Sequence, residues 1–321
     1  MAVTAETPAP EPQTARAVVM IRPAAFGRND VTRPSNRFQS ADPDPDAART
    51  AEAAAAEFDA LAAELTQHGV EVHAFPGRAT ASLPDEVFPN NWISTHGDGT
   101  VVLYPLMAWN RRPERRRDVL DELQQRGGGF RIERVIDLTH LEQDNRFLEG
   151  TGSVVLDRPN HVGFACLSPR SHPDALREFA RRLHYGIVTF EAGDRDGHAI
   201  YHTNVMLSLG ERFAVVCLAA IREVQERYRV LSRLERSNRE VIEISLEQLH
   251  AFAGNLIELK GAGGGVIALS ARAAASLTDA QREALGRHGA LAAVQIDTIE
   301  TFGGGSVRCM LAEVFLPKKA R

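Results

Sequence analysis

The chain has 321 residues, of which 44% are hydrophobic and 25% charged, and its formal net charge is −5. This is the composition of an ordinary soluble globular protein, long enough for one large core or for two domains. The mild acidity argues against a nucleic acid as the main partner, and no apolar stretch approaches the ~20 residues that cross a bilayer. The three cysteines form no Cys-x-x-Cys pair, which suits a reducing cytoplasm.

Residues 1–15 are rich in Pro, Ala, Glu and Thr and lack a basic segment followed by an apolar core. This composition predicts a disordered N-terminal tail and not a signal peptide, so we expect a single domain over residues 16–319. A basic run at residues 111–117 contains Glu114 and is followed by Asp118. It predicts the solvated start of a helix.

The predicted elements begin with a strand over residues 17–22, a helix over 47–67 that Gly69 ends, and a strand over 70–75. The order hairpin, helix, strand then recurs. The predicted hairpins pair residues 92–96 with 100–104, 152–156 with 161–167, 205–210 with 213–217, and 256–260 with 265–270. The predicted helices cover 113–126, 174–183, 219–232 and 278–288, and the strands that follow them cover 131–137, 187–191, 240–244, 292–296 and finally 309–316.

This recurrence gives about five units of roughly 50–60 residues, the spacing at which repeat architectures become visible. Each unit has one helix to cover a small sheet, and five units could close in a ring with strand ends at a central axis. Asn91, Glu149, His202 and Cys309 fall at equivalent junctions between units, so a ring would bring them together. An open parallel sheet is the alternative, but the recurring hairpins disfavour it because such sheets use single crossover strands.

Cys309 follows the three glycines Gly303 to Gly305 and is predicted to begin the last strand. Glycines let a ligand approach the backbone and leave N–H groups free to point at it. A cysteine in this position is either a small buried residue or a nucleophile, and the second interpretation requires partners elsewhere in the chain.

Candidate partners lie at the edges of two other apolar strands. His202 could act as the base that a thiol needs, and Glu149 could fix the tautomer of that base. Cys166 and Cys217, which lie inside apolar runs, are predicted core residues.

Three separated motifs, in the same order along the chain, resemble the pentein or guanidino-group-modifying superfamily. They are residues 148–152 (LEGTG), 201–204 (YHTN) and 303–309 (GGGSVRC). The superfamily includes arginine deiminase, dimethylarginine dimethylaminohydrolase, amidinotransferases and succinylarginine dihydrolase. Residues 88–92 (FPNNW) and 301–310 most resemble its citrulline-utilisation hydrolase group. The resemblance implies an α/β fold, a five-fold pseudosymmetric α/β propeller of hairpin-helix-strand units.

The resemblance also implies the roles of individual residues. Cys309 would be the nucleophile, His202 the general acid and base, and Glu149 the residue that orients the histidine. Arg170 matches a segment that supplies an arginine to the substrate α-carboxylate, for which a guanidinium fork is suited. The implied substrate-binding residues are Asp85, Phe88, Asn90, Asn91, Arg170, Asn204 and Gly305.

The chain departs from the arginine-directed members at Asn90, Asn91 and Asn204, where those members have acidic residues. A guanidinium has five N–H donors and no acceptor, and burying it without a carboxylate would be costly. Carboxamides suit a neutral ureido group, so the sequence favours the ureido carbon of citrulline or a related compound as the target. The other interpretation is that the asparagines cap turns, as Asn often does.

The predicted function is therefore a cytoplasmic hydrolase of non-peptide C–N bonds, acting on a small amino acid. A guanidine-directed deiminase or dimethylarginine hydrolase is the alternative, followed by an amidinotransferase and by a non-catalytic binding protein of the same fold. No cofactor or metal is predicted, because the histidines lack metal-ligand spacing and residues 261–265 lack the Lys-Ser/Thr of a phosphate loop. The sequence predicts no nucleic-acid or membrane partner and leaves a homo-oligomer open.

Overall fold

In the computed structural model, which describes residues 11–78, 83–125 and 129–319, the strands form five separate three-stranded sheets. The middle strand of every sheet pairs antiparallel with one neighbour and parallel with the other. Four sheets follow chain order: β3 (Ile93–Thr95), β4 (Thr100–Leu103) and β5 (Arg134–Asp137); β6 (Val155–Asp157), β7 (Val162–Cys166) and β8 (Gly186–Phe190); β9 (Leu207–Leu209), β10 (Phe213–Val216) and β11 (Glu240–Glu243); and β12 (Ile257–Gly261), β13 (Gly264–Ser270) and β14 (Ala290–Val294).

The fifth sheet joins the two ends of the described chain. It consists of β1 (Ala17–Arg22), β2 (Glu71–Pro76) and β15 (Ala312–Val314), with β15 antiparallel to β1. The predicted five-fold pseudosymmetric α/β propeller is thus confirmed, and its ring is closed by pairing between the first and last strands.

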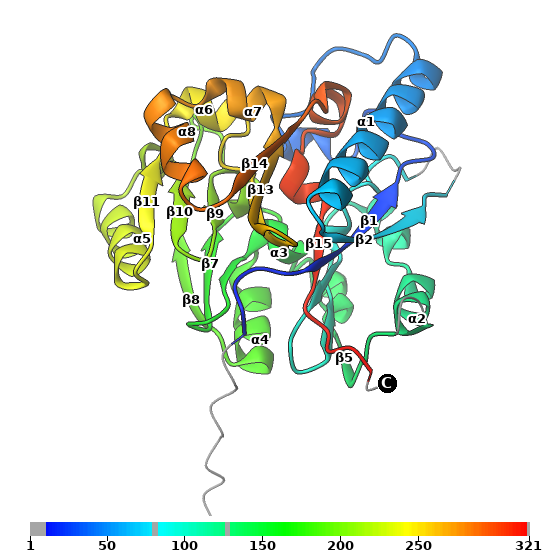
Figure 1. Ribbon diagram of the computed structural model, residues 1–321, viewed down its shortest axis with the longest axis horizontal. Helices are drawn as coiled ribbons and strands as arrows, with labels where there is room; N and C mark the ends of the chain where they lie inside the picture. Colours follow the sequence, from blue (N-terminus) through cyan, green and yellow to red (C-terminus); the bar gives the residue numbers. More distant parts are fainter. Residues whose placement is uncertain (1–10, 79–82, 126–128, 320–321) are drawn as a thin grey trace, which may run out of the picture.

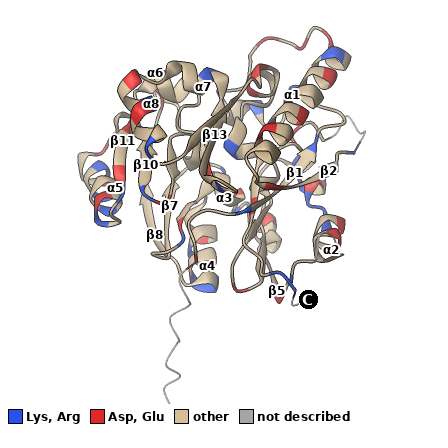
Figure 2. Ribbon diagram, in the orientation of Figure 1, with Lys and Arg blue, Asp and Glu red and all other residues tan. Residues whose placement is uncertain are grey.

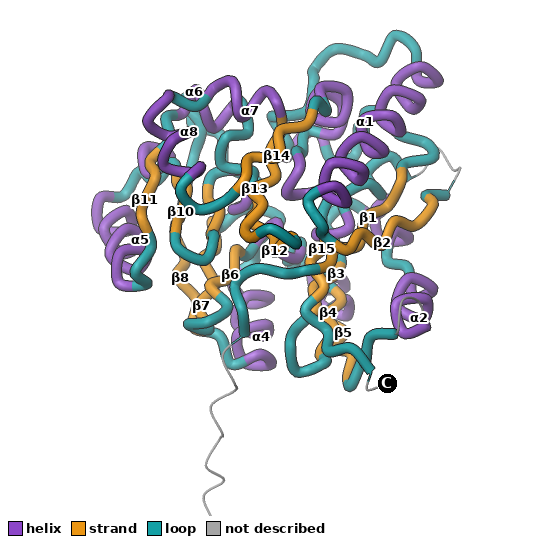
Figure 3. The backbone as a smooth tube through the Cα atoms, viewed as in Figure 1, coloured by secondary structure: helices purple, strands orange, loops and turns teal. Residues whose placement is uncertain are grey.

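A helical connection joins the two parallel strands of each sheet, as parallel pairing requires. These helices are α1 (Ala47–Gln67), α2 (Arg117–Gln125), α4 (Pro173–Leu183), α5 (Val224–Arg236), and the pair α7 (Ala271–Ser276) and α8 (Asp279–Gly286). One further helix, α6 (Leu246–His250), follows β11. They lie around the outside of the molecule while the strands lie inside (Figure 1; Figure 3). The strand ends therefore point toward the middle.

Local sequence explains the helix bounds. α1 begins after Asp46, whose side chain accepts the N–H of Arg49, and its buried residues recur every three or four positions through Phe58 and Leu65. α8 begins with a capping box between Thr278 and Gln281. The predicted helix over residues 47–67 is confirmed with both of its ends.

Short turns precede the first strand of each unit and carry the polar residues of the centre. They are the 3₁₀ turns Pro89–Asn91, Thr203–Val205 and Val307–Met310, the single helical turn α3 (Gly150–Ser153), and a turn over residues 251–254. Several of these turns contact one another although they lie far apart in the sequence. This is the convergence that the repeat predicted.

Several predicted elements were wrong in detail; the helix predicted over residues 219–232, for example, is α5 at Val224–Arg236. Cys309 is not on a strand but in the turn Val307–Met310, which the Cys309 N–H closes onto the Ser306 carbonyl at 2.9 Å. Residues 150–153 form α3 instead of the start of a strand, because the positive φ of Gly150 turns the chain beside Asn90. The helix predicted from residue 113 begins at Arg117, after the 3₁₀ helix Trp109–Glu114.

The predicted disordered tail over residues 1–15 also needs correction. Residues 1–10 lie outside the described part of the chain, but Gln13, Thr14 and Ala15 are buried. The Gln13 amide donates to the Leu156 carbonyl at 3.0 Å and accepts the Arg158 N–H at 3.0 Å. The domain thus begins before residue 16, because this segment bonds to backbone groups of other units.

Charges of both signs are spread over the outer helices (Figure 2). Cys166 and Cys217 are fully buried among apolar side chains, as expected. Within the described residues, no helix is long and apolar enough to cross a membrane.

Candidate active site

The turns at the centre of the ring surround a small cavity. Of the predicted residues, Asp85, Phe88, Asn91, Arg170, His202, Gly305 and Cys309 line it. Glu149, Asn90 and Asn204 do not line it, but each contacts a residue that does. The structure therefore brings all ten predicted site residues to one place, although they span more than two hundred positions of the chain.

Cys309 lies at the end of a loop that leaves a short π-helix, Ile299–Gly303. Gly304 has a φ of +62°, and a Cβ there would lie 2.6 Å from the Asn36 Nδ2. The Asn36 amide donates to the Gly304 carbonyl at 3.1 Å. Glycine is thus required at position 304 for both its conformation and its close contact.

Cys309 is 3% exposed, and its sulfur contacts two carboxamides. Its Sγ lies 3.3 Å from the Asn255 Nδ2 and 3.6 Å from the Asn204 Nδ2. Burial raises the pKa of the Cys309 thiol, and the Ser306 backbone and the Asn255 amide partly oppose that rise. The resting thiol is therefore largely protonated near neutral pH.

His202 is buried and its ring is fixed by one strong contact. Its Nε2 lies 2.8 Å from the Glu149 Oε2, so Nε2 carries the proton and Nδ1 is left as the acceptor. Burial lowers the pKa of His202 to about 4, although Glu149 opposes the change. A neutral imidazole with a free Nδ1 can take a proton from a thiol or a water.

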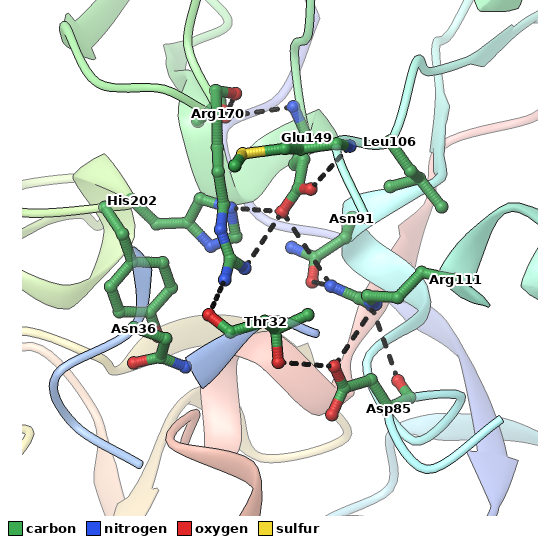
Figure 4. A network of polar contacts seen from close by, with 12 residues as sticks. Thr32, Asn36, Asp85, Asn91, Leu106, Arg111, Glu149, Arg170 and His202 are labelled. Atoms are coloured by element: carbon green, nitrogen blue, oxygen red, sulfur yellow. Dashed lines mark hydrogen bonds and ion pairs between the residues drawn. The ribbon is translucent and has the colours of Figure 1, made fainter. Parts of the chain in front are cut away.

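Glu149 is fully buried at the centre of a polar network (Figure 4). Besides His202, its Oε2 lies 3.3 Å from the Arg170 Nη1 and 3.8 Å from the Arg111 Nη1, and its Oε1 accepts the Met107 N–H at 3.1 Å. Burial alone would raise the pKa of Glu149, but Arg170 and His202 outweigh it and lower this pKa well below its usual range. The carboxylate therefore stays charged and can stabilise a protonated His202.

Asn90 and Asn91 form a joined pair at the end of the turn Pro89–Asn91. The Asn91 Nδ2 donates to the Asn90 Oδ1 at 2.9 Å, and the Asn91 Oδ1 accepts from the Arg111 Nη1 at 3.0 Å. A Cβ on Gly152 would lie 2.6 Å from the Asn91 Nδ2 and 2.9 Å from the His202 Nδ1. These two nitrogens are thus neighbours, and only a glycine fits between them.

Asp85 brings a carboxylate to the cavity wall. Its Oδ2 accepts from Asn29 at 2.7 Å and from Thr32 at 3.3 Å, but its buried Oδ1 has no hydrogen-bond partner among the described residues. A buried carboxylate oxygen without a partner is costly. Asp85 can therefore accept a donor or a cationic group of a ligand.

Phe88 packs beside the glycine loop. A Cβ on Gly303 or on Gly305 would lie 2.7 Å or 3.0 Å from its ring. Phe88 thus forms an apolar wall of the cavity.

Arg170 lines the cavity, but much of its guanidinium fork is already used. It donates to the Thr32 carbonyl at 3.0 Å, to the Ser35 hydroxyl at 2.8 and 3.1 Å, and to Glu149. It also stacks over the Tyr201 ring at 5.0 Å. These contacts make the expected bidentate grip on a carboxylate incomplete, since few N–H groups remain free.

Several residues of the site were missed, among them Asn36 and Tyr201, which line the cavity, and the polar residues Arg111 and Asn255. Arg111, expected at the solvated start of a helix, is 2% exposed and forms a bidentate pair with the buried Glu114, with Nη2–Oε2 at 2.8 Å. Asn255, which contacts Cys309, was not identified at all. The repeat contained the signal for Asn255, because it precedes the first strand of its unit just as the other site residues precede theirs.

One group of side chains away from the cavity could offer ligand atoms to a metal ion. Asp194, Asp196 and His198 place such atoms within 4.8 Å of one another. The Asp194 Oδ1 is already used by the backbone N–H groups of Asp196 and His198, so this carboxylate organises its own loop.

Five α/β units around a cavity with a buried cysteine, histidine and glutamate define a pentein-fold enzyme of the guanidino-group-modifying superfamily. The family model for eukaryotic N,N dimethylarginine dimethylhydrolase matches residues 22–316, and the chain belongs to that family. It is a hydrolase that acts on C–N bonds other than peptide bonds, as the sequence predicted. A search of curated protein sequences finds no match.

Solved structures share the fold at low sequence identity. The N-terminal domain of ArgZ, an arginine dihydrolase from cyanobacteria, is 18% identical with a TM-score of 0.72, over 94% of this chain and 99% of that one. AgrE, solved with ornithine and NAD⁺, is 19% identical with a TM-score of 0.72, over 96% of this chain but only 40% of AgrE. A dimethylarginine dimethylaminohydrolase adduct with S-methyl-L-thiocitrulline is 16% identical with a TM-score of 0.63, over 94% of this chain and 100% of that one.

Proposed function

We propose that this protein hydrolyses the ureido group of citrulline, or of a closely related amino acid, through a covalent intermediate on Cys309. The observation that carries this choice is the environment of Asn91. Its amide oxygen is bound to the cationic Arg111 at 3.0 Å, and the neighbouring Glu149 is already paired with His202 and Arg170. A second cation at this end would be repelled by Arg111, whereas a neutral ureido group would not.

The first half of the reaction forms an S-carbamoyl intermediate on the cysteine. The His202 Nδ1 takes the Cys309 proton, and the thiolate attacks the ureido carbon, whose oxygen gains the negative charge. Backbone N–H groups near Gly305 stabilise that oxyanion. His202 then returns the proton to the leaving nitrogen, the C–N bond breaks, and ornithine departs from an S-carbamoyl cysteine.

The second half restores the enzyme. His202 takes a proton from water, the resulting hydroxide attacks the carbamoyl carbon, and the C–S bond breaks to give carbamate and the thiolate. Carbamate then decays to ammonia and carbon dioxide, and His202 returns its proton to Cys309. Glu149 stabilises the imidazolium in both halves, because its carboxylate remains charged beside Nε2.

Two charged residues could bind the α-ammonium and α-carboxylate groups of an amino-acid substrate. The unpartnered Oδ1 of Asp85 suits an α-ammonium, and the remaining N–H of Arg170 suits an α-carboxylate. Three other arginines that could bind a substrate carboxylate, Arg22, Arg146 and Arg308, do not line the cavity and pair with Asp59, Asp174 and Glu313.

A guanidine substrate is the second candidate, and Asp85 favours it. Asp85 lines the cavity 3.6 Å from the Arg111 Nε, and its Oδ1 has no hydrogen-bond partner among the described residues. Burial raises the pKa of Asp85, and a cationic substrate such as arginine would favour its charged form by pairing with the Asp85 Oδ1.

Steady-state kinetics on citrulline, arginine and dimethylarginine, following ornithine and ammonia, separates the candidates. We expect kcat/KM to favour citrulline over arginine by about 30-fold, or ~2 kcal/mol, because a buried unpaired charge costs more than a neutral hydrogen bond. Asn91→Asp should reduce this ratio, since it adds a carboxylate beside Arg111. A wild-type preference for arginine, or an unchanged ratio in the variant, would assign the enzyme to guanidines.

The covalent step has its own test. Cys309→Ser should fold normally and lose turnover, because a hydroxyl is a far weaker nucleophile than a thiol beside the same base. Mass spectrometry of the wild-type enzyme mixed with substrate should find the carbamoyl group on Cys309 and not on Cys166 or Cys217. Substantial turnover by a folded Cys309→Ser protein would remove Cys309 from the mechanism. Release of the carbon unit onto an added amine, in place of water, would indicate an amidinotransferase-type reaction.

A further inference from the structure

Asn255 occupies the fifth of the five equivalent turns around the cavity. The other four turns carry Asn91, Glu149, His202 with Asn204, and Cys309, each just before the first strand of its unit. Asn255 precedes β12 in the same way, after the turn at residues 251–254, and is fully buried. The repeat therefore delivers one polar residue or more to the centre from every unit.

The orientation of the Asn255 amide is fixed by two backbone contacts. Its Oδ1 accepts the Arg308 N–H at 3.1 Å, and its Nδ2 donates to the Asn204 carbonyl at 2.8 Å. Exchanging the oxygen and nitrogen would lose both bonds, so the amide cannot flip. The second hydrogen of Nδ2 is then left for the Cys309 sulfur, 3.3 Å away.

Asn204 is held less firmly. Its Nδ2 and Oδ1 lie 3.6 Å and 3.8 Å from Sγ, so this amide can present either atom. It can accept the S–H of the thiol as well as donate to a thiolate. Asn255 differs because its Oδ1, 3.7 Å from Sγ, already accepts the Arg308 N–H, while its Nδ2 lies closer to Sγ, at 3.3 Å.

The sulfur has no cationic hydrogen-bond partner among the described residues. All the side-chain hydrogen bonds to Sγ come from Asn204 and Asn255. His202 is neutral at rest, because burial lowers its pKa to about 4, and the Arg308 guanidinium is paired with Glu313 at 2.9 Å. A neutral substrate would bring no cation to its reacting end either.

We propose that Asn255 is a further catalytic residue, whose fixed N–H stabilises the negative charge on the Cys309 sulfur. The proposal rests on Cys309 being the nucleophile. The same N–H acts twice in each cycle: it stabilises the thiolate that attacks the substrate carbon, and again the thiolate that leaves when water breaks the C–S bond. Hydrogen bonds to charged groups strengthen as charge develops, so the contribution is greater for the thiolate than for the thiol.

The test compares Asn255→Ala with the wild-type protein in three measurements. The ionisation of Cys309 is titrated by ultraviolet thiolate absorbance, as the difference from Cys309→Ser, and kcat and KM are measured against pH. We expect the thiol–thiolate equilibrium to shift toward the thiol by about tenfold or more, with a similar loss of kcat near neutral pH. The acid limb of the kcat profile should move to higher pH by the same factor, so that alkaline pH restores much of the activity.

A role in packing alone would behave differently. It would lower the melting temperature and reduce kcat at every pH, without moving the thiolate titration, and that result would overturn the proposal. Asn255→Asp provides a second variant if Asn255→Ala does not fold, because it keeps the shape and the acceptor for the Arg308 N–H. It replaces the donor with a carboxylate, so the shift should be larger than in Asn255→Ala.

These experiments distinguish a failure of the proposal for Asn255 from a failure of the proposed function. If Cys309→Ser retains turnover, the nucleophile assignment fails, and the proposal for Asn255 fails with it. If Cys309→Ser is inactive but the titration and the acid limb are unchanged in a folded Asn255 variant, only the proposal for Asn255 fails.

Discussion

The role of the charged residue Arg111 is decided by the residues that it contacts. Its sequence context is a run of arginines, yet it alone among them is 2% exposed, held by Glu114 and close to Asp85 and Glu149. Burial alone would lower the pKa of Arg111, but these carboxylates outweigh it and raise this pKa. Arg111 is thus a permanent buried cation that holds the Asn91 amide.

Removing only one member of the buried Arg111–Glu114 pair should destabilise the fold. Arg111→Met leaves the Glu114 carboxylate buried without its partner, so we expect a loss of about 3–5 kcal/mol in the free energy of unfolding. Arg111→Met/Glu114→Gln should recover much of this loss while kcat/KM stays low, because the Asn91 oxygen still lacks its donor. Chemical denaturation and kinetics on both variants check this.

The control is Arg117→Met, in the same run of arginines, whose exposed side chain lies 3.9 Å from Asp137. It should change the free energy of unfolding by less than about 1 kcal/mol. Equal losses in Arg111→Met and Arg117→Met would mean that the buried Arg111–Glu114 pair contributes no more than an exposed one.

His202 should make the folded protein sensitive to mild acid. Its pKa is lowered from 6.5 to about 4, so between these values the unfolded chain binds more protons than the folded one. The contribution of His202 is therefore complete above its unfolded pKa and is lost as the pH falls below it. Glu149, whose pKa is also lowered, adds to the loss below its own unfolded value of 4.5.

Other groups act in the opposite direction, because burial raises the pKa values of Asp85 and Glu300. The contribution of His202 is therefore isolated by subtracting the unfolding free energy of His202→Gln at each pH. We expect this difference to fall by about 2 kcal/mol between about pH 7.5 and about pH 5. A difference that does not change with pH would show that His202 titrates normally in the folded protein.

At the scale of elements, the site depends on short turns that contact one another closely. α3 lies against the turn that carries Asn90 and Asn91 and against the turn that follows His202. Gly152, in α3, leaves no room for a side chain between the Asn91 Nδ2 and the His202 Nδ1. The spacing of the reacting groups is therefore set by the packing of the turns as well as by the residues they carry.

Gly152→Ala should lower kcat by more than about tenfold, because its Cβ would displace the His202 ring or the Asn91 amide, and small misplacements are costly in catalysis. Thermal unfolding should change much less than activity. Gly286→Ala, at the end of α8 with no atom within 4 Å of the added Cβ, is the matched control and should keep full activity. Full activity in Gly152→Ala would show that the turns can separate freely.

At the scale of the whole molecule, the N-terminal segment joins units on the side of the ring where the buried Arg158 lies. Arg158 binds Glu11 at 2.9 Å and Gln13 binds carbonyls of two different units. Glu11 also accepts the Gly97 N–H and lies 3.7 Å from the His96 Nδ1. These contacts join the sheets to one another, and none of them involves a residue that lines the cavity.

Glu11→Gln should therefore destabilise the fold without changing catalysis. We expect a loss of about 1–3 kcal/mol in the free energy of unfolding, because the buried Arg158 would keep the Thr95 carbonyl at 3.2 Å but, of its two carboxylate partners, the more distant Glu313 at 3.9 Å. Asp59→Asn, which breaks the exposed pair with Arg22, is the control and should change stability by less than about 1 kcal/mol. Chemical denaturation measures both, and a large loss of kcat/KM in Glu11→Gln would contradict this purely structural role.

The sequence by itself determined the repeat, and through it the ring. Period-2 and helical patterns are local, so the five units, the bounds of α1 and the convergence of Glu149, His202 and Cys309 could be predicted from the order of the elements. The same reasoning, applied to the fourth hairpin, would have added Asn255.

Only the tertiary structure decided which charges are buried and what each one faces. The burial of Arg111, the contacts that occupy the Arg170 fork, the unpartnered oxygen of Asp85 and the burial of Gln13 all depend on side chains from different units. No local pattern encodes such contacts, because the free energy of a charge depends on its surroundings in three dimensions. The choice between a ureido and a guanidino substrate depends on the same balance of charges, and it is for this reason that the sequence alone left it open.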